Sequence, residues 1–255
     1  MLNNINLVLC LAGKGQRFID DGILIPKYLL KNNREESILS LIIKNLIQSG
    51  ITRFFLFVNE DYLEYKKTLL DTLESFKDAN FELAFIPHNS GQAETAKIAC
   101  SYIRKKFPES IHEPIGFHNG DTILINRDFS GYFRNQSLTW DGLIDTFISN
   151  DPSFSYVKVE NEQVLIIKEK DPISLNATSG LYFFKNLELY EKFYNSCNFN
   201  LSEKFISNVY ENMLSSGCVV LDNHYSNPLD TVILGTPKLY KDWVKNELST
   251  RTQGI

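Results

Sequence analysis

An apolar run that leads directly into a cationic glycine turn constrains this chain most. Residues 7–11 (Leu-Val-Leu-Cys-Leu) have the profile of a short buried strand. Two glycines, which let the backbone turn sharply, and three cations follow within one short span: Gly13, Gly15, Lys14, Arg17 and Lys27. Backbone N–H groups and cationic side chains match phosphate oxygens, so the segment predicts a polyphosphate site. The competing interpretation is a structural β-turn with a solvated Lys and Arg.

Two well-known phosphate motifs do not fit this segment. A dinucleotide-binding fingerprint needs a third glycine three residues after the second, where this chain has Phe18. A P-loop needs Ser or Thr directly after Gly-Lys, whereas Gly13-Lys14 is followed by Gly15. The sequence therefore favours neither a hydride-transfer enzyme nor a P-loop kinase.

The composition is that of an ordinary globular protein whose affinity for phosphate is local. The 255 residues are 43% hydrophobic and 22% charged, and the net charge of −5 argues against nucleic acid or an anionic membrane as a partner. No apolar run reaches the ~18 residues of a membrane span, and residues 1–11 lack the features of a signal peptide. Four scattered cysteines without metal-type spacing predict reduced thiols in a cytoplasmic protein: Cys10, Cys100, Cys197 and Cys218.

Strand and helix patterns alternate along the first half of the chain. We expect strands at residues 6–11, 53–58, 82–86 and 115–118, and helices at residues 36–49, 61–77 and 93–106. Such alternation predicts an α/β fold, a Rossmann-like three-layer sandwich with a mainly parallel, mixed sheet. Ligands of such sheets bind beyond the carboxyl ends of the strands, where Gly13 and the 119–121 turn would both lie.

From residue 141 onward short strands dominate and suggest an antiparallel extension of the sheet. We expect strands at residues 142–148, 155–159, 163–168 and 179–184, helices at residues 187–194 and 202–215, strands near Val219 and Val232, and a last helix from Pro237. No repeat or linker divides the chain. The prediction is one domain, residues 1–255, with a nucleotide-binding half (1–135) and an acceptor-binding half (136–255).

Two further turns carry chemistry-bearing side chains. Asp121 follows an apolar strand and a glycine turn, where a carboxylate is a suitable ligand for Mg²⁺, although Asn-Gly is also a common structural turn. Gly91 and Gln92 lie between a strand and a helix, where a base can approach a glycine and a Gln amide can read its edge. Helix capping by Asn89 or Ser90 is the alternative there, and His88 is interpreted as a loop residue.

The segment L-A-G-K-G-Q-R-F followed by P-K resembles the signature of the sugar-phosphate nucleotidyltransferases, the NTP transferase family. It is most similar to a bacterial subgroup that serves capsule and surface-polysaccharide synthesis, with Ala12 where many members have the first glycine. The resemblance implies a GT-A-like nucleotidyltransferase fold and assigns Arg17 and Lys27 as catalytic. It assigns a set of nucleotide-binding residues: Leu11, Ala12, Gly13, Lys14, Gly15, Gln16, Gly91, Gln92 and Gly120.

The same resemblance implies the remaining site residues. N-G-D matches the family's metal-binding aspartate, which makes Asp121 the Mg²⁺ ligand. Glu169-Lys170 matches a pair that binds the acceptor, and Gly180 lies in a matching strand, S-G-L-Y-F-F. The ending D-T-V-I-L-G-T-P departs from the family's D-x-G-T-P, because Ile233 stands at the aspartate's place. Asp230, or alternatively Asp222, would then supply the second metal ligand.

Together these matches imply an enzyme that transfers an NMP from an NTP to a phosphorylated acceptor, such as a sugar 1-phosphate, and releases pyrophosphate with the help of Mg²⁺. One alternative is a cytidylyltransferase for a non-sugar phosphate. A related glycosyltransferase is disfavoured because the chain contains no D-x-D triplet. A non-catalytic nucleotide-binding regulatory subunit would explain the irregular ending. The resemblance leaves a homo-oligomer open.

Overall fold

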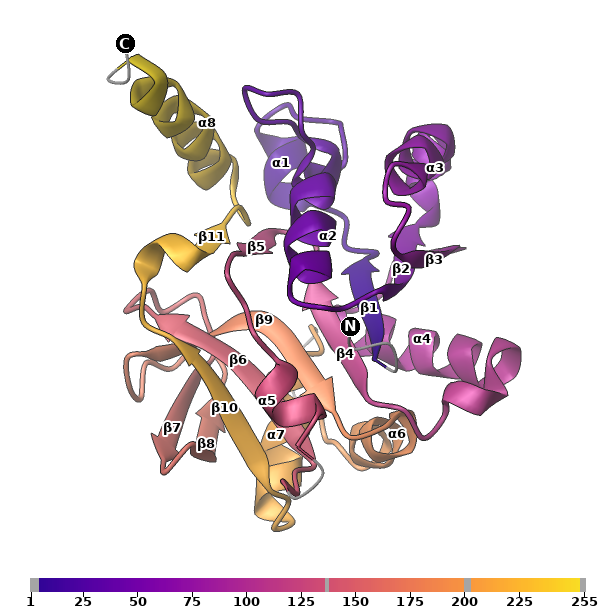
Figure 1. Cartoon of the computed structure of the whole chain (residues 1–255), viewed down its shortest axis with the longest axis vertical. Helices are drawn as coiled ribbons and strands as arrows, with labels where there is room; N and C mark the ends of the chain where they lie inside the picture. Colours follow the sequence, from indigo (N-terminus) through magenta and orange to yellow (C-terminus); the bar gives the residue numbers. More distant parts are fainter. Residues whose placement is uncertain (1–4, 136–137, 200–202, 253–255) are drawn as a thin grey trace.

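A computed structural model describes residues 5–135, 138–199 and 203–252. In this part of the chain, nine strands form one sheet in the order β3-β2-β1-β4-β9-β6-β10-β8-β7 (Figure 1). Its strands are β1 (Asn6–Leu11), β2 (Arg53–Asn59), β3 (Asn80–Ile86), β4 (Ile115–Asn119), β6 (Gly142–Ile148), β7 (Tyr156–Glu160), β8 (Gln163–Lys168), β9 (Asn176–Phe184) and β10 (Val220–Tyr225). Two short strands, β5 (Thr122–Leu124) and β11 (Thr231–Ile233), pair separately.

The helices alternate with the strands of the first half and lie between strands of the second. They are α1 (Gln16–Asp20), α2 (Ile38–Gln48), α3 (Lys66–Glu74), α4 (Gln92–Lys106), α5 (Ser130–Phe133), α6 (Leu187–Asn195), α7 (Ile206–Ser215) and α8 (Pro237–Thr252). Four 3₁₀ turns complete the chain: η1 (Lys27–Leu29), η2 (Glu60–Tyr65), η3 (Pro108–Ser110) and η4 (Pro228–Asp230). Within the described residues, none of these helices is long and apolar enough to cross a bilayer.

Parallel pairing in the first half follows from the apolar runs. β1 is buried between β2 and β4, with Leu9 opposite Leu56 on one side and His118 on the other. Strands buried on both faces read as continuous apolar runs, which is the pattern of β1 and β2. Because β1 is followed directly by the glycine turn, the turn lies at the carboxyl edge of the parallel strands.

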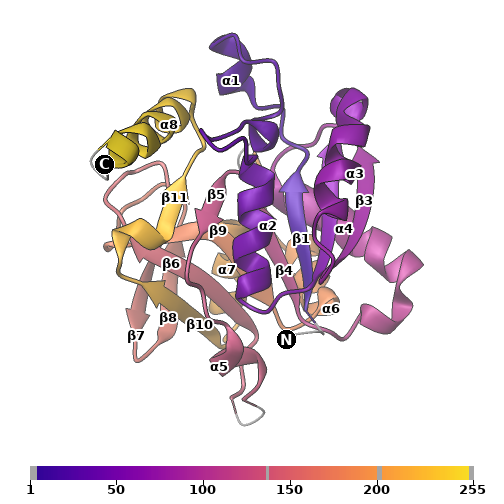
Figure 2. The ribbon, with the colours of Figure 1, turned by 45° about the horizontal axis from the view of Figure 1, so that its top comes forward.

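Helices cover both faces of the sheet and confirm the predicted three-layer α/β class. One face packs on α2, which Figure 2 shows crossing in front of the sheet, through Leu39, Ile42, Ile43 and Leu46. The opposite face packs on α4, α6 and α7, with Ala96, Tyr190 and Tyr210 in its core. Each core contains residues from before and after residue 135, so the two halves share both hydrophobic layers.

The four strands predicted as an antiparallel extension do pair in that way, and β10 adds a parallel pair that the sequence did not indicate. β6 and β9 are antiparallel, as are β7 and β8, but β10 pairs in parallel with β6. The chain reaches β10 through α7, a crossover that permits parallel pairing. The predicted helix at residues 202–215 begins at Ile206, and residue 202 lies outside the described residues.

Local exceptions to the predicted elements occur where polar residues interrupt the pattern. The expected helix at residues 61–77 divides into η2 and α3, and Tyr62 within η2 has a non-helical conformation. α1 and α5 were not expected, because each has five residues or fewer and no apolar periodicity of its own. β5 was also missed, since a strand of three residues has no measurable alternation.

Candidate active site

A cavity of about 380 Å³ opens at the carboxyl edge of the sheet. The turn after β1 forms one wall and the loop after β3 forms another, and Lys27, the first residue of η1, also lines the cavity. The cavity is lined by Gly13, Lys14, Gly15, Gln16, Arg17, Phe18, Lys27, His88, Asn89, Ser90, Gly91, Glu203 and Gly235. The structure therefore brings together the glycine turn, the three cations and one of the two predicted base-side residues.

Lys27, which lines this cavity, forms an ion pair with Asp121, which lies next to the lining residue Gly235. Lys27 Nζ donates to Asp121 Oδ2 over 2.5 Å, although the two residues are 94 positions apart in the chain. Burial alone would raise the pKa of the Asp121 carboxyl, but the charge and hydrogen bond of Lys27, with smaller help from His118 and Arg17, lower it below its ordinary value. Asp121 is thus held as a carboxylate close to a cation.

The turn between β1 and α1 forms the wall of the cavity that carries Lys14 and Arg17. Lys14 and Arg17 line the cavity and are exposed. Among the described residues, neither forms an ion pair with a carboxylate. Tyr62 in η2 donates its hydroxyl hydrogen to the Lys14 carbonyl oxygen over 2.8 Å. This hydrogen bond fixes the turn from a neighbouring element, a role for which the sequence around Tyr62 gives no signal.

Leu11 and Ala12 lie beneath the turn. Both side chains are buried, Leu11 in the core that contains α2 and Ala12 in the opposite core. Gly120 packs against Leu11, because a Cβ on Gly120 would approach Leu11 Cδ2 to 2.2 Å. These three of the predicted nucleotide-binding residues therefore support the turn and do not line the cavity.

The loop after β3 separates the two predicted base-side residues. Gly91 lines the cavity at φ 125°, a conformation that disfavours side chains, and directly precedes α4. Gln92 turns away, and its Nε2 donates to the Gly180 carbonyl oxygen over 3.1 Å. Gln92 thus ties the nucleotide-side loop to β9, which is a different placement from the predicted contact with a base.

Side chains in this loop are mostly engaged with one another. Asn89 Oδ1 accepts from the Gly91 N–H and from Thr95 Oγ1, and Glu94 accepts from the Ser90 N–H over 2.7 Å. The predicted alternative of capping by Asn89 or Ser90 is replaced by Glu94, which reaches back from the first turn of α4 in the manner of a capping box. Glu94 also accepts from Lys204, and these hydrogen bonds lower its pKa to about 2.

Gly180 makes room for a neighbour within the protein. A Cβ on Gly180 would lie 2.1 Å from Asn119 Nδ2, and its φ of 89° is unfavourable for other residues. The Asn119 side chain therefore fits against β9 just before the Gly120-Asp121 turn. We predicted that Gly180 leaves space for the acceptor, and the structure gives that space to Asn119.

Glu169 and Lys170, the pair predicted to bind the acceptor, lie in the turn directly after β8. Glu169 Oε2 accepts hydrogen bonds from Ser155 and from Ser207, the latter over 2.5 Å, and these two serines fix the carboxylate. Lys170 is exposed, and its Nζ lies 4.5 Å from the centre of the Phe205 ring. Since Phe205 follows Glu203 and Lys204 directly, this short segment joins the acceptor side to the nucleotide cavity.

The structure does not place Asp230 beside Asp121. The Leu234 N–H donates to the Asp121 carbonyl oxygen, whereas the Ile125 N–H donates to the Asp230 carbonyl oxygen, so the two aspartates lie at opposite ends of the β5–β11 ladder. Four residues of strand separate them by roughly 13 Å. Asp230 instead accepts from Asn126 Nδ2. The shift from the family's spacing places this carboxylate at the other end of the ladder, and its role as a metal ligand stays a prediction.

Asp222 is not an alternative partner for Asp121. It is buried in β10, where its Oδ1 accepts from Thr146 Oγ1 over 2.6 Å. Burial, opposed by Thr146 and His224, raises the pKa of Asp222 to about 6. Ile233, where the family pattern would have an aspartate, pairs with Thr122, the residue after Asp121.

Asp121 fits Mg²⁺ as a single protein ligand. Among the described residues, no three His, Cys, Asp or Glu side chains gather into a metal cluster. Mg²⁺ is commonly held by one or two carboxylates together with substrate phosphates and water, so one carboxylate beside a phosphate-binding turn is a sufficient donor set. An ion would accordingly be expected to bind with the nucleotide and not before it.

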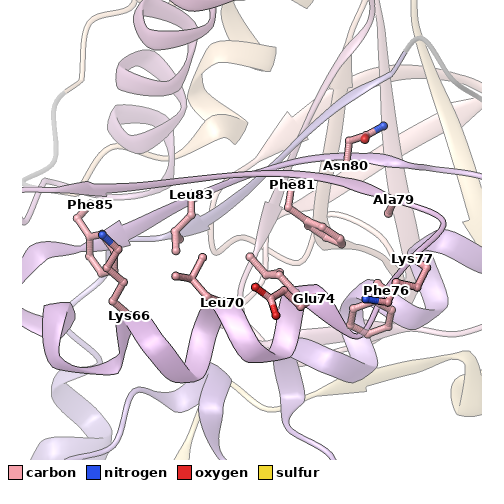
Figure 3. Close-up of a pocket in the computed structure, with 11 residues that line it drawn as sticks. Lys66, Leu70, Glu74, Phe76, Lys77, Ala79, Asn80, Phe81, Leu83 and Phe85 are labelled. Carbon is pink, nitrogen blue, oxygen red and sulfur yellow. The ribbon is translucent and has the colours of Figure 1, made fainter.

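A second, larger hollow of about 570 Å³ lies between α3 and the edge strand β3. Figure 3 shows Phe81, Leu83 and Phe85 of β3 pointing toward Leu70 of α3. Lys66, Glu74 and Lys77 lie at its rim. This hollow contains none of the glycine turn, Lys27 or Asp121, so the smaller cavity at the sheet's carboxyl edge is the candidate active site.

The chain belongs to the Nucleotidyl transferase family, whose model matches residues 6–228. The match covers the glycine turn, Lys27, Asp121 and the Glu169-Lys170 pair, and ends before Asp230 and the Gly-Thr-Pro segment. It shows an enzyme family that transfers nucleotidyl groups. A comparison with curated proteins found no significant match.

Several solved structures share the fold. A nucleoside-diphosphate-sugar pyrophosphorylase from Vibrio cholerae RC9 superposes with a TM-score of 0.81 at 22% identity, over 94% of this chain and 99% of that one. An inositol-1-phosphate CTP transferase from T. maritima gives 0.75 at 16% identity, over 100% and 98%. A UDP-glucose pyrophosphorylase complexed with UDP-glucose gives 0.74 at 14% identity, over 96% and 98%.

Proposed function

We propose that this protein transfers a nucleoside monophosphate from an NTP to a phosphorylated small-molecule acceptor. An oxygen of the acceptor phosphate attacks the α-phosphorus and forms the new P–O bond. The bond between the α-phosphorus and its bridging oxygen breaks, and pyrophosphate leaves with the electron pair. The observation that carries the proposal is the Lys27–Asp121 pair, whose Lys27 lines a cavity together with the glycine turn and two further cations.

The residues of this cavity have distinct parts in the reaction. Lys14, Arg17 and the turn would bind the β- and γ-phosphates, which become the leaving pyrophosphate. Lys27 would stabilise the charge that develops on oxygens around the α-phosphorus, which requires it to exchange Asp121 for the substrate. When bound, Mg²⁺ neutralises phosphate charge, and Asp121 would hold it.

The acceptor would bind on the side of Glu169 and Lys170. Glu169 is fixed by two serines and suits an acceptor hydroxyl, because one of its oxygens remains available after Oε2 is engaged. The exposed Lys170 ammonium suits the acceptor phosphate. A sugar 1-phosphate fits this arrangement, and we place the enzyme in the cytoplasm, where it would supply an activated precursor for capsule or surface polysaccharide.

The test is NTP-dependent pyrophosphate release with a panel of phosphorylated sugars, polyols and amino alcohols, with and without Mg²⁺. We expect release only with an acceptor and Mg²⁺ present, and loss of the Mg²⁺ response in Asp121→Asn, since an amide oxygen carries no net charge. If Asp121→Asn gave the same Mg²⁺ titration curve as the parent protein, the ion would have to bind at another residue. Nucleotide binding without turnover for any acceptor in the panel would favour a regulatory subunit.

A further inference from the structure

The candidate active site contains a carboxylate that the proposed reaction does not use. Glu203 lines the cavity together with the loop after β3, at the side where His88, Asn89, Ser90 and Gly91 also lie. Within the described part of the chain, its carboxylate has no hydrogen-bond or ion-pair partner. An acidic side chain is unexpected in a cavity for a triphosphate, so its position needs a reason.

The backbone around Glu203 is fixed against the nucleotide-side loop. The Lys204 N–H donates to the Ser90 carbonyl oxygen over 2.6 Å, and the Ala93 N–H donates to the Lys204 carbonyl oxygen over 3.1 Å. A Cβ on Gly91 would lie 3.0 Å from Glu203 Cγ and 2.7 Å from the Lys204 carbonyl oxygen. The stem of Glu203 therefore packs on Gly91, and a larger residue at position 91 would displace it.

The two sides of the cavity differ in charge, which orients a nucleotide. Lys14, Arg17 and Lys27 line the side of the glycine turn, where a triphosphate would be bound. The base of that nucleotide would then extend toward the loop after β3, where the Asn89 amide is already engaged by its own loop. Glu203, which is exposed, is the carboxylate among the residues that line this cavity and would lie on the side of the base.

We propose that Glu203 selects nucleotides whose base carries an exocyclic amino group, namely cytosine, guanine or adenine, over uracil and thymine. The inference rests on the proposed function, because it requires an NTP in this cavity. A carboxylate accepts hydrogen bonds and donates none, so it pairs with an amino group. In uracil and thymine the ring N–H lies between two carbonyl oxygens, and these would meet the carboxylate with like partial charge.

The experiment measures the dissociation constants of Mg²⁺ complexes of CTP, GTP, ATP, UTP and dTTP by calorimetry, which needs no knowledge of the acceptor. We expect at least one amino-bearing nucleotide to bind about tenfold or more tightly than UTP and dTTP. In Glu203→Gln this nucleotide should lose most of that advantage in affinity. UTP should bind more tightly, because the amide N–H can donate to a carbonyl oxygen of uracil. Glu160→Gln, an exposed residue of β7 with the same charge change, is the matched control.

Three results would overturn the inference. UTP or dTTP could bind as tightly as every amino-bearing nucleotide, or Glu203→Gln could leave the order of affinities unchanged. A loss in Glu203→Gln for the preferred NTP but not for its 2′-deoxy form would assign Glu203 to the ribose. These results leave the proposed function standing, whereas failure of all five nucleotides to bind would defeat that function and this inference together.

Discussion

At the scale of residues, Lys27 and Asp121 form a close ion pair in the candidate active site. A cation and a carboxylate 2.5 Å apart, both largely shielded from water, are stable partners without substrate, yet each is assigned a different partner in the reaction. In the proposed reaction, a nucleotide and its metal ion would have to replace this pair. The pair would keep both side chains in place before the substrate binds.

Replacement of Lys27 by alanine should leave the fold intact and lower turnover by at least about a hundredfold, the scale of losing one preorganised electrostatic stabiliser. The expected loss is in kcat at saturating NTP, because Lys27 acts where charge develops during transfer. Steady-state pyrophosphate release measures it, with Lys31→Ala as the control, since Lys31 forms only an exposed pair with Glu35. Turnover within threefold of the parent would remove Lys27 from the mechanism.

Asp222 provides a test of stability against pH. Its pKa is raised from the ordinary 3.8 to about 6, so the carboxyl stabilises the fold fully below pH 4 and this contribution is lost as pH rises through about 6. Asp222→Asn should therefore increase the free energy of unfolding by about 1 to 3 kcal/mol at pH 8 and leave it nearly unchanged at pH 4. Urea unfolding at both pH values measures this.

The same variant separates stability from metal binding. Asp222→Asn should retain its Mg²⁺-dependent activity, because Asp222 is bonded to Thr146 within the sheet. A gain in stability that is equal at both pH values would show that Asp222 is not the titrating group. A loss of the Mg²⁺ response would restore Asp222 as a metal ligand.

At the scale of elements, the β5–β11 ladder is held to the main sheet by one buried ion pair. Arg127 donates to both carboxylate oxygens of Asp145 on β6, and also to the Asp230 carbonyl oxygen and to Thr231 Oγ1. Both charged side chains are completely buried. Since Asp121 begins this ladder and Gly235 follows it, the pair positions these two residues of the candidate active site.

Arg127→Met should destabilise the protein by about 3 to 5 kcal/mol, because it leaves Asp145 buried without its cation. Arg127→Met combined with Asp145→Asn should lose less than the sum of the single variants, since the uncompensated charge is then absent. Urea unfolding of the three variants measures the coupling. A loss of less than about 1 kcal/mol in Arg127→Met would mean that water or a rearranged ladder compensates Asp145.

The bounds of strands that consist of a continuous apolar run could be predicted from the sequence. The partner and register of a strand could not, because they depend on distant parts of the chain. The bounds of β1, β6 and β8 agree with the prediction because apolar runs fill each strand between polar or glycine turns. The parallel pairing of β10, in contrast, depends on where α7 delivers the chain. The position of Asp230 was misjudged for a related reason: the register of β11 against β5 decides which residue faces Asp121.

The same distinction holds for the site. Lys27, Asp121 and the glycine turn carry local sequence signals, and the structure brings them together. Glu203 and Tyr62 carry none, because each reaches the cavity or its turn from another element through contacts that no local pattern records. Gln92 and Gly180 carry a signal but contact each other, which only the packing of α4 against β9 reveals.

At the scale of the whole molecule, the nine-stranded sheet joins the first half of the chain (residues 5–135) to the second. β4 of the first half pairs with β9 of the second over four residue pairs, and both hydrophobic cores draw on both halves. An isolated segment of residues 1–135 would expose the edge of β4 and much of both cores. The halves are therefore expected to depend on each other for stability.

We predict that the intact chain unfolds in one cooperative transition, as expected when its two main hydrophobic cores draw on both halves. Thermal unfolding can be followed by far-UV circular dichroism, which detects the sheet of both halves, and by fluorescence of Trp140 and Trp243, which lie in the second half. The two curves should coincide if the halves unfold together. A saturating Mg²⁺–NTP complex should move both curves together, by about 2.7 kcal/mol at 100 times its Kd. Curves that separate, or a nucleotide shift confined to one probe, would mean that the two halves are independent domains.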